Sequence, residues 1–142
     1  MDAASLRILV LAMLLAVGCG RTAPALNGAV FAVPAYPGAE VRDTLSAGTT
    51  DRHGQPVTDT QTWWLRFTDP PEKVVAFYDA GLPGARKFPS SEVPGTVARY
   101  EWKPSGASAE ESVTVIISAQ DIQISEIARP GKRTGATSWA GK

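Results

Sequence analysis

Hydrophobic side chains alternate with polar ones in several short stretches, which is the pattern of half-buried β-strands. In the clearest stretch Trp63, Leu65 and Phe67 alternate with Thr62 and Trp64. Because successive side chains of a strand point to opposite faces, the first three are predicted to lie in the core. The predicted strands are residues 41–45, 58–68, 96–103, 112–119 and 121–128.

One stretch, residues 69–82, has helical periodicity instead. Asp69 is predicted to cap the helix N-terminus, Pro70 fits a position that needs no amide partner, and Glu72 completes a capping-box pattern. At 100° per residue the apolar side chains gather in one stripe, so the helix is predicted to pack on a sheet. The stripe consists of Val74, Val75, Tyr78 and Leu82, with Phe77 at its edge.

These elements predict an α+β fold of two layers, a mainly antiparallel sheet of about five strands with one helix packed on one face. The predicted domain covers residues 36–128, and the aperiodic residues 129–142 are expected to form a disordered tail. The longest irregular connection is 81–95. We expect Phe88 or Val93 to pin it to the core, and a mobile lid over a site is the alternative.

The first eighteen residues have the organisation of a signal peptide, with Arg7 in the positive region and an apolar run over 8–17. As a helix this run would span only about 15 Å, too short to cross a bilayer. Residues 15–19 (LAVGC) resemble the bacterial lipobox, which implies that Cys19 is acylated and becomes the new N-terminus. Cleavage by an ordinary signal peptidase is the alternative. Cys19 is the single cysteine, and acylation would remove an otherwise exposed thiol.

The resemblance to the lipobox implies attachment to a bacterial envelope membrane, facing the periplasm. Residues 19–35 would form the lipidated cysteine and a tether rich in glycine, proline and alanine. Gly20 stands where an aspartate would resemble the inner-membrane retention signal, so the outer membrane is favoured over the inner one.

The domain also resembles a group of small bacterial lipoproteins and secreted domains without an assigned activity. Their pattern is Tyr-Pro-Gly-Ala before a strand and Thr-Asp-x-Pro-Glu-x-Val-x-x-Phe-Tyr at a helix start, which residues 36–39 and 68–78 meet. After the helix this chain has Leu82-Pro83-Gly84 where many of those proteins have Gly-Trp. The resemblance implies a shared fold and brings no catalytic residue.

Neither the net charge nor the sequence motifs indicate a particular ligand or catalytic activity. With 14 basic and 14 acidic residues the net charge is +0, which gives no field for nucleic acid. No metal site or cofactor motif is recognised. His53 is the only histidine and is expected in a solvated turn, and Glu110 and Glu111 are expected to be solvated loop carboxylates. A hydrolase-type enzyme acting on cell-wall or lipid substrates is the alternative to a binding or assembly module.

The sheet face away from the helix is the best candidate for a binding site. Alternation places Trp64, Arg66, Arg99 and Ile116 there, together with Val97 and Glu101. One interpretation is that the loop or the tether covers this face. The other is that it docks an envelope protein or ligand, since Trp and Arg are typical interface anchors.

Overall fold

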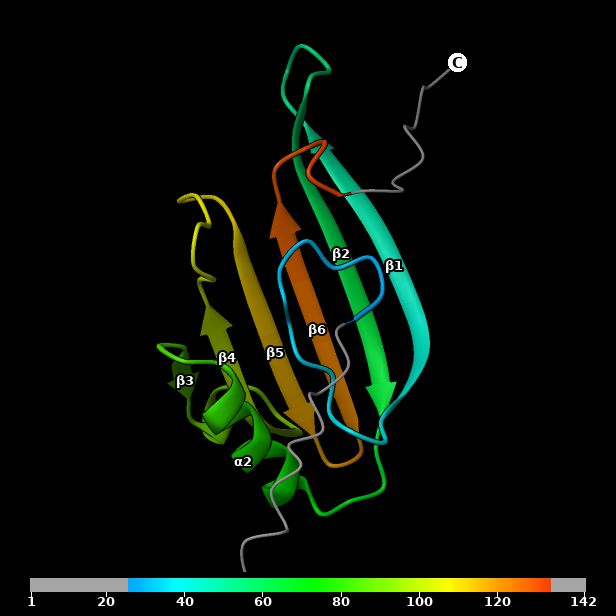
Figure 1. The fold of residues 1–142 in the computed structure, drawn as a ribbon, viewed down its shortest axis with the longest axis vertical. Coiled ribbons are helices and arrows are strands. Elements are labelled where there is room, and N and C mark those ends of the chain that lie inside the picture. Colours follow the sequence, from blue (N-terminus) through cyan, green and yellow to red (C-terminus); the bar gives the residue numbers. More distant parts are fainter. Residues whose placement is uncertain (1–25, 134–142) are drawn as a thin grey trace, which may run out of the picture.

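The computed structural model describes residues 26–133 and shows one antiparallel sheet with a helix on one face (Figure 1). The strand order is β1-β2-β6-β5-β4-β3, and every neighbouring pair is antiparallel. The α+β prediction is thus right in outline, with six strands rather than five. The elements are β1 (Glu40–Thr50), β2 (Pro56–Arg66), α2 (Pro71–Gly81), β3 (Arg86–Phe88), η1 (Ser90–Glu92), β4 (Thr96–Trp102), β5 (Ser112–Ser118) and β6 (Asp121–Ala128).

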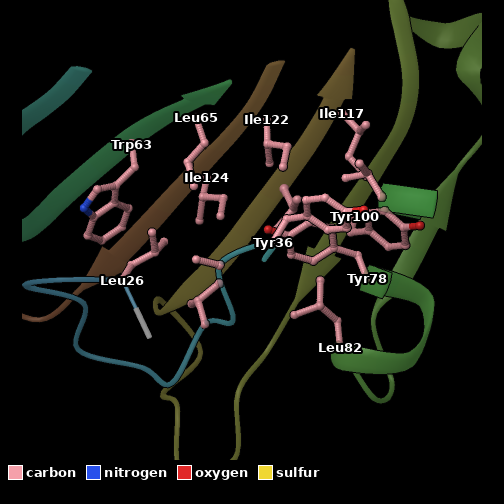
Figure 2. Packing of buried hydrophobic residues seen from close by; sticks show 14 of the residues in the cluster. Leu26, Tyr36, Trp63, Leu65, Tyr78, Leu82, Tyr100, Ile117, Ile122 and Ile124 are labelled. Atoms are coloured by element: carbon pink, nitrogen blue, oxygen red, sulfur yellow. The ribbon is translucent and has the colours of Figure 1, made fainter. Parts of the chain in front are cut away.

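The core lies on the side of the sheet that helix α2 covers, as the alternation predicted, and the N-terminal residues 26–36 also pack on that side. Trp63, Leu65 and Phe67 are at most 3% exposed, and Val74 and Tyr78 of the helix are fully buried. Figure 2 shows Tyr100 of β4 and Ile117 of β5 near Tyr78 of the helix, while Trp63 of β2 lies near Leu26 of the N-terminal segment, which belongs to the same core. We call this side of the sheet the inner face and the opposite side the outer face.

The helix begins differently from the prediction. Its N-cap is Pro70, and no side chain caps the first turn. Asp69 instead accepts a hydrogen bond from the Tyr36 hydroxyl at 2.7 Å. Burial and this carboxylate together raise the pKa of Tyr36 to about 12. Asp69 therefore fixes the turn before β1 to the start of the helix rather than capping the helix.

The sixth strand, β3, lies inside the connection 81–95 that was expected to be irregular. It pairs with β4 through Arg86 opposite Glu101 and Phe88 opposite Arg99. Lys87 points to the inner face, where its ammonium lies 3.0 Å from Asp79 of the helix. Neither Phe88 nor Val93 pins the connection to the core, since Phe88 lies on the outer face and Val93 is exposed.

The expected tether is wrong for the residues that the structure describes. Residues 26–36 cross the inner face of the sheet beside the helix, shown in blue in Figure 1, and Leu26, Val33 and Ala35 are buried. The backbone amides of Val30 and Phe31 each donate to the Glu126 carboxylate at 2.9 Å. The packed domain therefore includes residues 26–35. Residues 1–25, with the predicted signal peptide and Cys19, lie outside the described part.

The expected disordered tail also needs correction over its first residues. Arg133 is only 9% exposed, and its guanidinium lies 2.8 Å from the Glu126 carboxylate and 3.2 Å from that of Asp59. It also donates to the backbone oxygen of Gly28 at 2.7 Å. We call this network of Glu126 and Arg133 with residues 28–31 the clasp, because it joins both ends of the domain to β6. Residues 134–142 lie outside the described part.

Glu111 forms a second buried anionic centre and is not the solvated carboxylate that the sequence suggested. It is fully buried, whereas Glu110 is exposed. Its carboxylate lies 2.7 Å from the Lys132 ammonium and accepts from the backbone amides of Ser108 and Arg129 at 2.8 and 3.1 Å. Hydrogen bonds from Lys132 and the Ser108 amide hold the pKa of Glu111 at about 2, although burial opposes them.

Candidate functional site

The outer face brings most of the sequence-predicted site residues into one line. Strand register places six residues directly opposite one another across all six strands, so that Trp64, Ile116 and Arg99 share one row. We call it the central row, and it runs Asp43, Trp64, Gln123, Ile116, Arg99, Phe88. With strands about 4.8 Å apart, Trp64 and Phe88 stand four strand spacings, or about 19 Å, from each other.

Arg66 flanks the central row at the end of β2. It lies opposite Asp121, and its guanidinium forms an ion pair with that carboxylate at 3.2 Å. Both side chains are about half exposed, at 51% and 47%, so this pair orients Arg66 without removing it from solvent. Val97, by contrast, sits at the irregularity between Thr96 and Ala98 and stands outside the row.

Phe88 is the site residue that the sequence reasoning missed. The Arg86 guanidinium lies 4.5 Å from the centre of its ring, and the Arg99 guanidinium lies 5.0 Å from it. Arg99 also forms an ion pair with Glu101. This end of the row therefore presents an aromatic ring with two cations within about 5 Å of its centre, close enough for cation–π attraction.

A second row lies beside the central one and leads to an open groove. It runs Leu45, Thr62, Ser125, Thr114, Glu101, Arg86. The last three residues of this row also line a groove of about 510 Å³, together with Gly84, Trp102, Lys103, Ala109 and Ser112. The Lys103 ammonium donates to the backbone oxygen of Ala109 at 2.6 Å. The groove and the central row are thus parts of one continuous polar and aromatic surface.

The described parts of the two segments that were considered as covers, residues 26–35 of the expected tether and the connection 81–95, lie elsewhere. Residues 26–36 pack on the inner face with the helix, and the connection 81–95 extends the sheet sideways as β3 (Figure 1). Trp64, Ile116 and Arg99 are each partly exposed. Within residues 26–133, the outer face therefore remains open.

The other candidate chemistry lies apart from this surface. His53 is exposed at the tip of the β1–β2 hairpin, where Asp51 accepts hydrogen bonds from the amides of His53 and Gln55 at 2.8 and 2.9 Å. In the described residues no three His, Cys, Asp or Glu side chains gather as metal ligands would. No helix between residues 26 and 133 is both long and apolar enough to cross a membrane.

The outer face gathers tryptophan, arginine, phenylalanine and isoleucine, with two of its three arginines already oriented by ion pairs. Aromatic residues and arginine are the side chains that most often dominate the binding energy of protein interfaces. Searches against protein-family models, curated proteins and solved structures gave no match to this chain.

Proposed function

We propose that this chain is a lipid-anchored protein of the bacterial envelope, attached through Cys19, that binds another envelope protein with the outer face of its sheet. It faces the periplasm, with the outer membrane favoured, and acts as a binding or assembly module without a cofactor. The observation that carries the binding role is the open central row, in which Trp64, Ile116 and Arg99 stand in register with Arg66 beside them.

Because the N-terminal segment from Leu26 onward packs on the domain, only a short stretch of chain can separate the domain from the lipid on Cys19. Only residues 20–25 separate Cys19 from Leu26, the first described residue of the domain. Seven extended steps of about 3.3 Å amount to about 23 Å, whereas a tether over residues 20–34 would reach about 50 Å. Two or more acyl chains, each contributing about 0.8 kcal/mol per buried methylene, would hold the protein stably on the bilayer.

The anchor is tested by replacing Cys19 with serine and fractionating cells. We expect the wild-type protein to sediment with membranes after a carbonate wash and the Cys19→Ser protein to leave the membrane fraction or to accumulate as an unprocessed precursor. Sedimentation of a processed Cys19→Ser protein with washed membranes would show that another part of the chain provides the attachment.

The binding role is tested by crosslinking in native membranes. Trp64→Ala removes the largest side chain of the central row, and we expect the yield of crosslinked partner to fall at least about 30-fold, the effect of a 2 kcal/mol interface anchor. Val57→Ala is the matched control, because Val57 is exposed on the same strand but outside both rows. Equal partner yields from the wild type and Trp64→Ala would contradict docking at this face.

A further inference from the structure

The groove at the β3 end of the outer face carries two cations that have no ion-pair partner in the described residues. Arg86 and Lys103 both line the groove, and both are exposed. Within residues 26–133 neither of them forms an ion pair. Among the described residues that line the groove, Glu101 alone is acidic, and its carboxylate is already paired with Arg99. The groove therefore has an excess of positive charge.

The arrangement of side chains on β3 and β4 explains why Arg86 has no carboxylate partner. Arg86 stands directly opposite Glu101, but Glu101 pairs with Arg99, which is two residues away on the same face of β4. The Arg86 guanidinium instead lies 4.5 Å from the centre of the Phe88 ring. An aromatic ring attracts and orients a cation without neutralising its charge. Arg86 is therefore held beside the groove and still carries its full charge.

The other hydrogen-bond donors of the groove lie around the same space. Lys103 follows Glu101 by two residues, so Arg86 and Lys103 are diagonal neighbours across the two strands, with their Cβ atoms about 7–8 Å apart. The Lys103 ammonium donates to the Ala109 backbone oxygen at 2.6 Å, which leaves two of its three donors free. Ser112 and Thr114 add two hydroxyl groups. Both cations can thus reach one anionic group placed between them.

We propose that this groove binds a carboxylate from an acidic segment of the partner protein, an aspartate or glutamate side chain held between Arg86 and Lys103. The planar fork of arginine matches the two oxygens of a carboxylate, and charge-assisted hydrogen bonds of this kind are about twice as strong as neutral ones. The inference deepens the proposed function and rests on it, because it gives the chemical character of the partner that docks on the outer face.

The shape of the groove favours a protein segment over a small molecule. Small-molecule pockets are mainly apolar and enclose most of their ligand. This groove of about 510 Å³ is open, and charged and hydroxyl side chains form much of its lining. It also continues into the central row, where a segment of about six extended residues would span the 19 Å or so from Phe88 to Trp64.

The position of the anchor disfavours a phospholipid headgroup as the source of the anionic group. Leu26, through which the domain joins the chain that leads to Cys19, packs beside Trp63 on the inner face (Figure 2). The groove lies on the opposite, outer face. A ligand that reaches it from the side away from the anchor fits this arrangement better than the bilayer that holds the anchor.

The test is isothermal titration calorimetry of the full-length protein in a nonionic detergent. Tetraglutamate is the probe, and tetraglutamine is its neutral counterpart. We expect the wild type to bind tetraglutamate and not tetraglutamine. Arg86→Gln and Lys103→Gln should each weaken tetraglutamate binding at least about ten-fold, the effect of one hydrogen bond to a charged group. Arg52→Gln is the matched control, because Arg52 is an exposed arginine at the tip of the β1–β2 hairpin, and it should bind like the wild type.

Three results of this titration would overturn the proposal. The first is an affinity for tetraglutamate that neither Arg86→Gln nor Lys103→Gln changes, and the second is equal binding of tetraglutamate and tetraglutamine. Inorganic phosphate and glycerophosphoglycerol, the phosphodiester of a lipid headgroup, serve as further titrants. The third result is binding of either phosphate compound that depends on Arg86, without any binding of tetraglutamate, and it would make the groove a phosphate site instead.

Crosslinking in native membranes separates this inference from the proposed function. If Arg86→Gln loses tetraglutamate binding while Trp64→Ala keeps the wild-type yield of crosslinked partner, docking at the central row is refuted and the carboxylate site stands. If the partner yield falls in Trp64→Ala but not in Arg86→Gln, docking stands and the acidic segment of the partner is refuted.

Discussion

The clasp leads to a prediction that tests whether the C-terminal residues up to Arg133 are packed on the domain or form part of a disordered tail. Arg133→Met keeps most of the length of the side chain but removes the cation that lies 2.8 Å from the Glu126 carboxylate. Glu126 is fully buried, so its charge cannot be neutralised by solvent in place of Arg133. If residues 129–142 were a disordered tail, this substitution would be silent.

The magnitude follows from the remaining partners of Glu126. Removing one member of a buried ion pair costs about 3–5 kcal/mol. The amides of Val30 and Phe31 still donate to Glu126, so we expect the lower end, about 3 kcal/mol. In a domain of this size 1 kcal/mol shifts the melting temperature by about 4–8 °C, so Arg133→Met should melt at least about 12 °C lower.

The assay is thermal unfolding at pH 7, followed by circular dichroism. Arg129→Met is the matched control, because Arg129 is an exposed arginine near the same chain end. It should stay within about 0.5 kcal/mol of wild type, as surface substitutions usually do. A melting temperature of Arg133→Met equal to that of Arg129→Met would show that the clasp does not hold the domain together.

Two further predictions concern the second buried carboxylate and the helix. The pKa of Glu111 is lowered to about 2, so its ionised form contributes stability that is complete above the unfolded pKa of about 4.5 and is lost as pH falls toward 2. Glu111→Gln should therefore lower the melting temperature at pH 7. As the pH falls from 4.5 to 2, the melting temperature of this variant should decrease less than that of the wild type. An equally steep decrease in both proteins would contradict the role of Glu111. Tyr78→Ala removes a fully buried aromatic ring and should lower the free energy of unfolding by about 3–5 kcal/mol in a denaturant titration. Ala76→Gln, on the exposed side of the helix, should change this free energy little. Equal stabilities of the two variants would refute the predicted helix orientation.

The inner face could be predicted from sequence because its signal is local. Strict alternation through Trp63, Leu65 and Phe67 and the helical spacing of Val74 and Tyr78 each fix one buried face without knowledge of the partner. The same alternation also placed Trp64 on the outer face. Neither the buried face nor the position of Trp64 required knowledge of which residues lie opposite each other on neighbouring strands.

The features that were missed depend on partners far along the chain. The second half of β1, residues 46–50, is a run of small residues without hydrophobic alternation. It is a strand because it pairs with residues 56–61 of β2. Phe88 could not be assigned to a face because β3 has only three residues, too few to show a period. Glu126 and Glu111 look like solvated residues until the amides and cations that surround them are brought together by the fold.

The central claim is that the inner face holds the fold while the outer face is free to bind. The melting temperatures of Trp63→Ala and Trp64→Ala test it most directly, because the two tryptophans are adjacent in sequence and point to opposite faces. Trp63 is 2% exposed, and its loss should cost about 3–5 kcal/mol, or at least about 12 °C. Trp64→Ala should lose only its cross-strand contacts, about 1 kcal/mol or less, and melt within about 8 °C of wild type. Equal large drops in both variants would contradict the claim, because Trp64 would then be part of the structure that holds the domain together.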